Sequence, residues 1–436
     1  MGGRVGERAG AATPRVDFNL DDCFLHDKDR LTHAEALALI EAQCRPIAGT
    51  GRIPLAVAGG RYAAEAVVSP RNVPGHDNAA VDGYAFRHGD LAPDGPTALP
   101  VADRLAAGAS TAAPLPAGAA VRIFTGAALP DGADTVVMQE DVTLPEDGVV
   151  AIPAGLRPGA NARSHGEDLR AGETVIATGA RLRPQDIAAL ASIGAAEVAV
   201  YRPLRVAVLS TGDELRRPGE ATAPGEVYDA NAYLLLGLLK GLPVEVADLG
   251  ILRDTASAVE AALRDAAGRF DVILTSGGAS RGEEDHLVKA VSKLGRLHGW
   301  QIAVKPGRPM GFGAIRDAAI MTLPGNPVAA MVCFLLYAMP MIARLGGGRP
   351  PAPRRFPLPA AFALAKKKPD RREFLRGFTV ERDGRLFADK FPRDGSGLIS
   401  SLRAASGLIE IPEQVTRVDE GDMVAFVPFS EFGLPA

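Results

Sequence analysis

The chain has 436 residues, of which 47% are hydrophobic and 23% are charged, and its formal net charge at pH 7 is −4. This balance is typical of a globular protein with roughly two to four domains. It excludes the strongly basic surface on which nucleic-acid binding depends, so we expect no nucleic-acid partner.

The three cysteines are Cys23, Cys44 and Cys333. Their odd number and wide spacing predict neither a disulfide framework nor a zinc site, and favour a reducing, cytoplasmic compartment. The start of the chain lacks the apolar core of a secretory signal, and residues 1–17 are predicted to be a disordered tail. Residues 328–343 carry no charge, but a membrane span needs about 20 apolar residues, so we expect a buried helix and no membrane contact.

The N-terminal half is predicted to contain a mixed domain interrupted by a β domain. Thr32 and Glu35 have the spacing of a helix capping box, and apolar residues at helical spacing follow them. We group residues 18–62 and 164–203 as one discontinuous mixed α/β linker domain. Between them, residues 63–163 contain short Val, Ala and Ile runs separated by Pro, Gly and Asp, which indicates an inserted β domain.

The C-terminal half has a different rhythm. Residues 204–346 alternate short apolar runs with helical patterns, which predicts a doubly wound α/β domain, a parallel sheet covered by helices on both faces. The four runs predicted to be strands are Arg205–Leu209, Val244–Leu249, Asp271–Thr275 and Ala319–Leu323. After a Gly- and Pro-rich linker, residues 354–436 are predicted to form a small β-barrel. The fold class is therefore multidomain, α/β plus β.

The loops after the predicted parallel strands are the expected ligand site, because ligands of such sheets bind at the carboxyl ends of the strands. Small and hydroxyl residues in these loops let backbone N–H groups approach a phosphate. The residues selected on this ground are Ser276, Gly277, Gly278, Ser280, Pro324, Gly325 and Asn326. The loops and their surroundings also carry acids that suit a bridging cation such as Mg²⁺, namely Glu214, Asp229, Asp254 and Asp285. Capping of the following helix remains the alternative for Asp229 and Asp285.

Two cations, Lys305 and Arg308, stand on a turn whose prolines restrict the backbone. Held in this way they suit anionic oxygens, and an ordinary surface turn is the alternative.

Several motifs in order along the chain resemble one known family, from about Leu20 to Pro428. They include DNAAVDGYA, VAVLSTGDEL, ILTSGGASRGEEDH, VKPGRP, LPGNPVAA and REFLRG. The chain is similar to the molybdopterin molybdenumtransferases of the MoeA type, which are related to the E domain of gephyrin.

This resemblance implies an elongated homodimer of four-domain subunits, whose doubly wound domain resembles molybdopterin adenylyltransferase. The active cleft would lie between this domain of one subunit and domains of its partner. The implied reaction takes adenylyl-molybdopterin and molybdate, with Mg²⁺, and yields molybdenum cofactor and AMP. Molybdopterin adenylyltransferase and proteins that mature molybdoenzymes are the implied partners.

The resemblance also implies roles for particular residues. The implied functional acids are Asp82, Asp168, Glu214, Asp229, Asp254 and Asp285, with Glu214 and Asp285 as metal ligands. Lys305 and Arg376 would bind molybdate or phosphate oxygens, together with Arg308, and Thr125 would line the cleft. The resemblance does not say which acid performs which step.

The sequence departs from the family pattern at Ala79, Ala230, Arg281, Gln301, Arg308 and Ser406. Gln301 replaces an expected lysine, and Arg281 adds a cation to the phosphate loop, which could compensate. Two alternatives to the transferase function remain: adenylyl transfer to molybdopterin, which the extra domains disfavour, and a non-catalytic molybdopterin-binding scaffold.

Overall fold

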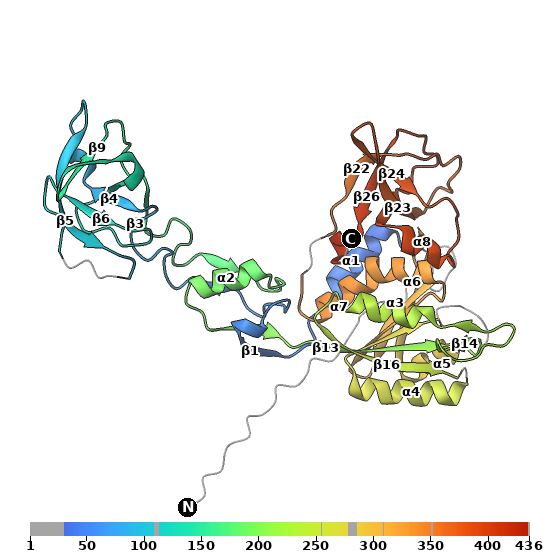
Figure 1. Cartoon of the computed structure of the whole chain (residues 1–436). Helices are drawn as coiled ribbons and strands as arrows, with labels where there is room; N and C mark the ends of the chain where they lie inside the picture. Colours follow the sequence, from blue (N-terminus) through green and yellow to red (C-terminus); the bar gives the residue numbers. More distant parts are fainter. Residues whose placement is uncertain are drawn as a thin grey trace, which may run out of the picture.

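The structure, a computed structural model, describes residues 30–108, 113–253, 255–277, 286–307, 309–349 and 352–434. The predicted tail, residues 1–17, and Cys23 lie outside the described residues. Figure 1 shows an elongated molecule, in which a β module at one end is joined by a narrow linker to a larger body. The body contains the α/β sheet, its helices and the C-terminal β domain (Figure 1).

A six-stranded sheet lies at the centre of the body. Its strands, in spatial order, are β16 (Val244–Leu252), β13 (Leu204–Thr211), β17 (Val272–Ser276), β21 (Ala318–Leu323), β20 (Pro309–Ile315) and β18 (Gly295–Gln301). The first four are parallel, so the predicted parallel sheet is confirmed. The antiparallel strands β20 and β18 were not predicted, because Gly311 and Gly313 break the apolar pattern of β20. A Cβ on Gly313 would lie 2.0 Å from the Arg296 carbonyl oxygen, so glycine permits this close pairing.

Helices cover both faces of this sheet, as predicted for a doubly wound domain. One face carries α3 (Ala230–Leu239), α6 (Pro327–Cys333), a π-helical turn η4 (Phe334–Ala338) and α7 (Met339–Leu345), and the other carries α4 (Ala256–Arg269) and α5 (His286–Leu294). Alternate residues of β13 divide between the two cores: Val208 packs on the α3 side and Leu209 on the α4 side.

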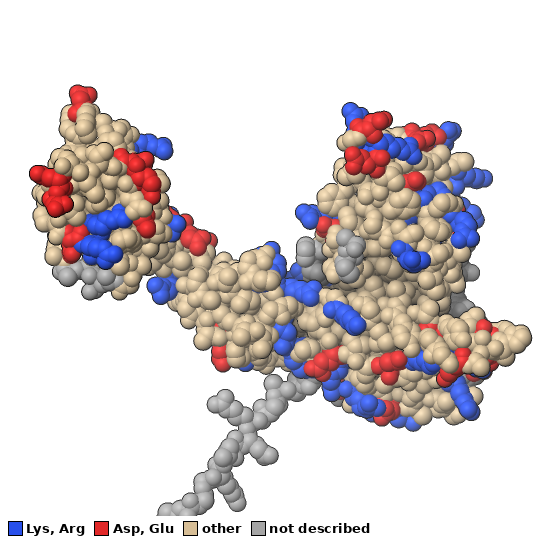
Figure 2. Space-filling view, viewed as in Figure 1, with Lys and Arg blue, Asp and Glu red and all other residues tan. Residues whose placement is uncertain are grey.

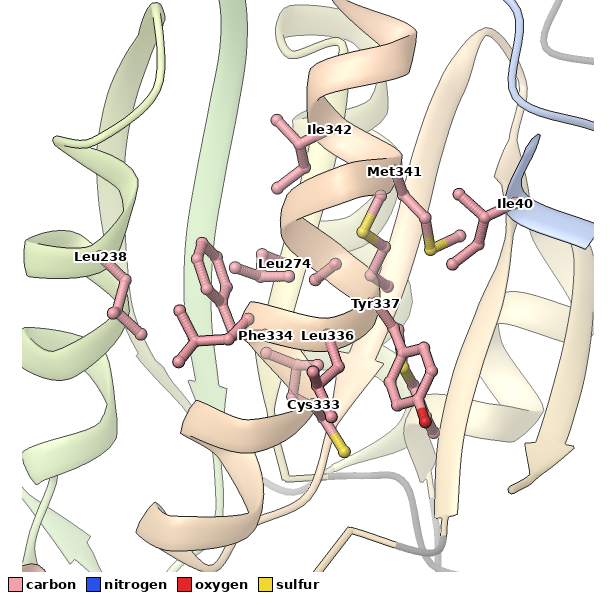
Figure 3. Close-up of a cluster of buried hydrophobic side chains, with 14 of the residues drawn as sticks. Ile40, Leu238, Leu274, Cys333, Phe334, Leu336, Tyr337, Met341 and Ile342 are labelled. Carbon is pink, nitrogen blue, oxygen red and sulfur yellow. The ribbon is translucent and has the colours of Figure 1, made fainter. Parts of the chain in front are cut away.

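The apolar run Pro327–Leu345 is, among the described residues, long and apolar enough to cross a membrane by length and composition. Its side chains lie in the largest hydrophobic cluster of the body, around Phe334, Tyr337 and Met341 (Figure 3). The run therefore has the surroundings of a core helix.

Helix α1 (His33–Gln43) begins with the predicted capping box, in which the Glu35 N–H donates to the Thr32 hydroxyl oxygen and the Thr32 N–H donates to the Glu35 carboxylate. Ala36 and Ile40 of α1 pack into the cluster formed by α7 and the central sheet. This differs from our grouping of residues 18–62 with the linker, because the apolar stripe of α1 finds its partners about 300 residues later in the sequence.

The linker is made by two separate chain segments. Its paired strands are β1 (Thr50–Pro54) with β12 (Glu197–Tyr201), and β2 (Val67–Val68) with β11 (Thr174–Ile176), and its helices are η1 (Leu55–Val57) and α2 (Pro184–Ser192). A hydrophobic cluster that includes Ala63, Leu182 and Val200 joins the two segments.

We call residues 78–152 the β module. Its six-stranded sheet has the order β7 (Thr135–Met138), β4 (Gly83–Phe86), β6 (Ala120–Ile123), β5 (Thr97–Leu105), β9 (Val149–Ile152) and β8 (Thr143–Glu146). Short elements beside the sheet are β3 (Asn78–Ala79), which pairs with β10 (Ala162–Arg163), and the turns η2 (His88–Asp90) and η3 (Gln139–Asp141). The two faces of the sheet belong to separate hydrophobic clusters.

The C-terminal domain is a small barrel. Its strands are β19 (Val304–Lys305), β23 (Arg372–Arg382), β25 (Gly407–Ile411), β26 (Met423–Pro428), β22 (Phe356–Pro359) and β24 (Arg385–Lys390), with α8 (Ile399–Ala404) and η5 (Phe429–Phe432). A bridge between Ala360 and Ala388 joins the two ends of the sheet. Because β19 belongs to the chain of the α/β domain and pairs with β23, it fixes the barrel to that domain.

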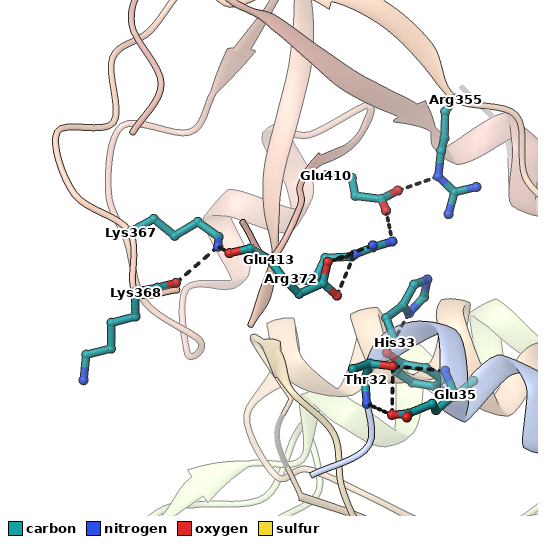
Figure 4. Close-up of polar contacts among 10 residues, drawn as sticks. Thr32, His33, Glu35, Arg355, Lys367, Lys368, Arg372, Glu410 and Glu413 are labelled. Atoms are coloured by element: carbon teal, nitrogen blue, oxygen red, sulfur yellow. Dashed lines mark hydrogen bonds and ion pairs between the residues drawn. The ribbon is translucent and has the colours of Figure 1, made fainter. Parts of the chain in front are cut away.

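A polar network lies where α1, the core helix run and the barrel meet (Figure 4). The His33 Nδ1 is 2.9 Å from the Tyr337 hydroxyl, and the imidazole packs edge-on against Tyr337 and Phe374. Arg372 and Glu410 form an ion pair beside it. Burial lowers the pKa of His33 from 6.5 to about 4, so His33 is neutral in the folded protein at pH 7.

This burial predicts a pH-dependent stability. The unfolded chain takes up a proton on His33 near pH 6.5, whereas the folded chain does so only near pH 4, so acid favours unfolding. The free energy of unfolding is therefore unaffected by the protonation of His33 above pH 6.5. It falls as the pH drops from 6.5 to 4, by up to about 3 kcal/mol in total. Calorimetric melting should show this slope in the wild type and a smaller one in His33→Gln, with the exposed His165→Gln as the matched control. Equal slopes in all three proteins would contradict the prediction.

Candidate functional site

A pocket of about 620 Å³ opens at the carboxyl edge of the central sheet, between the α/β domain and the barrel. It brings together six of the predicted substrate-binding residues: Gly277, Lys305, Pro324, Gly325, Asn326 and Arg376. The loops after β17 and β21 form one wall and β23 the other, so the position agrees with the general rule for doubly wound sheets.

Lys305 enters the pocket from the short strand β19. Its Nζ lies 3.2 Å from the Glu373 carboxylate, which is buried and also pairs with Arg371 at 2.7 Å. Two cations therefore share one carboxylate, and the Lys305 side chain remains 45% exposed. The charged residues that line the pocket are Lys305 and Arg376 together with Glu373 and Asp394, so the part-exposed Lys305 ammonium is the cation most accessible to an anionic ligand.

Arg376 lies deeper in the same wall. Its Nε donates to the Ser401 hydroxyl at 3.1 Å, and its Nη2 donates to the carbonyl oxygens of Arg393 and Gly395 at 3.3 and 3.4 Å. Burial lowers the pKa of Arg376, but a guanidinium remains charged in proteins. Arg376 thus holds residues 393–396 against the pocket while presenting a cation to it.

Asn231, at the start of α3, was not among the predicted site residues. Its Nδ2 donates to the Ser276 hydroxyl at 2.8 Å and to the Gly325 carbonyl oxygen at 2.6 Å. One buried amide therefore ties together the loops that follow β17 and β21. The available signal was its place two residues after the helix cap Asp229, in the segment EVYDAN.

We expect Asn231→Ala to loosen both loops, because it removes two buried hydrogen bonds worth about 1 kcal/mol each. The affinity of the pocket for an oxyanion should fall about tenfold, measured by titration calorimetry with molybdate. Ser276→Ala is the matched control, since it leaves the bond from Asn231 to Gly325 in place and should have a smaller effect. Unchanged affinity in Asn231→Ala would contradict this role.

Two of the predicted acids, Asp229 and Glu214, do not line the pocket. Asp229 caps α3 by accepting from the Ala232 N–H at 3.1 Å, is 2% exposed and has Arg217 at 3.7 Å. The capping alternative therefore describes the structural role of Asp229. Glu214 is exposed on the turn after β13, where a Cβ on Gly212 would lie 2.6 Å from its carboxylate.

Asp82 and Thr125 are neighbours in the β module. The Thr125 N–H and hydroxyl both donate to Asp82 Oδ1, at 2.8 and 2.7 Å. These hydrogen bonds, with Arg122 nearby, lower the pKa of Asp82, so its carboxylate is ionised at neutral pH. Asp168 is exposed in the linker. The β module lies far from the pocket within one chain (Figure 1).

The remaining predicted residues, Gly278, Ser280, Asp254, Asp285 and Arg308, lie outside the described residues. Within the described part of the chain, no group of three or more His, Cys, Asp or Glu side chains is placed to hold a metal ion.

These features define a multidomain protein whose doubly wound domain and barrel share a pocket lined by Lys305 and Arg376. Models of the MoeA N-terminal region (domains I and II), the probable molybdopterin binding domain and the MoeA C-terminal region (domain IV) match residues 31–194, 207–344 and 358–429. The chain belongs to the MoeA family.

Individual relatives agree with this assignment. A molybdopterin molybdenumtransferase of Haemophilus influenzae is 40% identical over 383 residues, covering 87% of this chain and 94% of the relative. Molybdopterin molybdenumtransferase 2 of Mycobacterium tuberculosis is 34% identical, covering 89% and 96%. The crystal structure of a molybdopterin biosynthesis MoeA protein from Pyrococcus horikoshii matches with a TM-score of 0.73 and 32% identity, covering 92% of this chain and 99% of that one.

Proposed function

We propose that this protein is a molybdopterin molybdenumtransferase, which inserts molybdenum from molybdate into adenylyl-molybdopterin, releases AMP and forms molybdenum cofactor. The names of its relatives support molybdenum transfer to a molybdopterin. The observation that carries the proposal is the pocket that Lys305 and Arg376 line beside two strand-end loops. Two fixed cations among backbone amides suit a tetrahedral oxyanion.

Asp82 is the acid best placed to act on water. Thr125 holds Oδ1, so Oδ2 can orient a water molecule and accept its proton. The water oxygen forms a bond to the adenylyl phosphorus, and the anhydride P–O bond breaks. Its electron pair stays on the pterin phosphate, and AMP leaves. Cations around the phosphates stabilise the developing negative charge.

A divalent cation, held by Glu214 and Asp285, is part of this proposal. When bound, it neutralises charge on the substrate phosphates. Binding of Mn²⁺, followed by its electron paramagnetic resonance spectrum, should weaken in Glu214→Gln and not in the exposed Glu220→Gln. Equal binding in both variants would remove Glu214 from the metal site.

A homodimer follows if Asp82 and Arg376 serve one reaction, because the β module of a chain lies far from its own pocket (Figure 1). A second copy would then supply the module. Asp82→Asn and Arg376→Ala subunits, each nearly inactive alone at low molybdate, should regain about a quarter of wild-type activity under the same conditions when co-expressed, since half of the dimers have one intact site. No regain would oppose a shared site.

The decisive experiment measures AMP release from adenylyl-molybdopterin with Mg²⁺, with and without molybdate. Molybdate-dependent release with cofactor formation is the expected result. Release of pyrophosphate from ATP and molybdopterin would indicate an adenylyltransferase instead. Binding without release would indicate a scaffold.

We place this reaction in the cytoplasm, beside the adenylyltransferase that makes its substrate and the proteins that mature molybdoenzymes. The free, buried thiols of Cys44 and Cys333 support a reducing compartment.

A further inference from the structure

A row of three side chains crosses one face of the β module beside Asp82. Tyr84 on β4 is in register with Arg122 on β6, and Arg122 is in register with Arg104 on the parallel strand β5. Both guanidinium groups lie over the Phe124 ring, whose centroid is 4.6 Å from the Arg104 Cζ and 4.8 Å from the Arg122 Cζ. We call the two arginines Arg104 and Arg122, together with the Phe124 ring that both contact, the arginine row.

Two guanidinium groups that both lie over one ring are close enough to repel each other, which disfavours this arrangement in the folded protein alone. Among the described residues neither guanidinium has a carboxylate within ion-pair distance; Arg122 donates to the Gly83 carbonyl oxygen at 3.0 Å and to the Gln139 side-chain oxygen. Phe124 offsets part of the repulsion through cation–π contacts. Figure 2 shows cationic side chains gathered on this module. The row therefore has two cationic groups available to an anion.

The arginine row also lies next to Asp82, the proposed base that accepts a proton from water. Gly83, which accepts from Arg122, directly follows Asp82, and Thr125, which holds Asp82, directly follows Phe124. An anion on the row would therefore lie beside the Asp82 carboxylate. Guanidinium groups match phosphate oxygens in shape and charge.

We infer that the arginine row binds the phosphoanhydride oxygens of the nucleotide-bearing substrate and places its phosphorus beside Asp82. This rests on the proposed function, and it gives the β module a binding role of its own. Lys305 and Arg376 would hold the molybdate, and the row would hold the anhydride.

The first test titrates the full-length protein with inorganic pyrophosphate by calorimetry. Arg104→Ala should weaken binding about tenfold or more, because it removes a charge-assisted contact from an exposed position. Arg104→Glu should weaken it further. Arg157→Ala, an exposed arginine of the adjoining loop, is the matched control and should bind as the wild type does. Equal affinity in Arg104→Ala and the wild type would overturn the inference.

The second test measures the KM and kcat of AMP release. Arg104→Ala should raise the KM for adenylyl-molybdopterin about tenfold, with a smaller effect on kcat. Arg104-dependent pyrophosphate binding without AMP release would support the row and oppose the proposed function. Normal AMP release with an unchanged KM in Arg104→Ala would oppose the row alone.

Discussion

Asp82→Asn should lower the kcat of AMP release about 10²- to 10⁴-fold, the range that loss of a positioned base produces. The amide oxygen of asparagine can still accept from the Thr125 N–H and hydroxyl, so the local structure should persist while the charge is lost. Single-turnover measurement of AMP release would separate this loss from a change in substrate binding.

Thr125→Val provides the comparison for this variant. It removes one of the two hydrogen bonds that lower the pKa of Asp82, so that pKa should rise. In the wild type these hydrogen bonds keep the Asp82 carboxylate ionised to lower pH. In Thr125→Val the carboxylate takes up its proton at a higher pH, so the acid limb of the kcat profile should move to higher pH. A wild-type profile in Thr125→Val, or wild-type kcat in Asp82→Asn, would show that Asp82 is not the base.

Arg376→Ala should raise the KM for molybdate about 10²-fold or more, since hydrogen bonds to a charged group contribute about 1.5–3 kcal/mol each. The substitution removes a cation from the pocket and also releases the loop at residues 393–396. Titration with molybdate, monitored by AMP release, measures the change.

Arg376→Lys should recover little, because an ammonium cannot replace a planar guanidinium that donates to Ser401, Arg393 and Gly395 together. Arg403→Ala, on the exposed side of α8, is the matched control for loss of an arginine nearby. An equal KM in Arg376→Ala and Arg403→Ala would exclude Arg376 from oxyanion binding.

Secondary structure could be predicted best where hydrophobic residues recur at regular spacing or a helix cap has its usual residues. The four parallel strands followed from apolar runs alternating with helical patterns, and the cap of α1 followed from Thr32 and Glu35. Strand β20 could not be predicted in this way, because Gly311 and Gly313 are needed for close pairing and remove the apolar signal. The packing of α1 onto α7 depends on contacts between distant segments, which local patterns do not contain.

Some residues of the candidate site could likewise be predicted from local sequence patterns, and others could not. Gly277, Gly325 and Asn326 could be chosen because strand-end loops of a parallel sheet meet at one edge. Glu373, which fixes Lys305, and Asn231, which ties two loops, were missed because their roles arise from single tertiary contacts. Asp229 shows the converse, since its spacing suited both a functional acid and a cap.

The position of α1 has a consequence for how the protein is synthesised. His33 and its partner Tyr337 are 304 residues apart, and almost the whole α/β domain must be translated before they can meet. At roughly 5 to 20 residues per second, α1 waits on the order of 15 to 60 s after leaving the ribosome before its apolar face is covered. The nascent chain therefore exposes Ala36 and Ile40 for most of its translation. The core of the body is complete only when α1 packs against η4 and α7, which are translated last in the α/β domain.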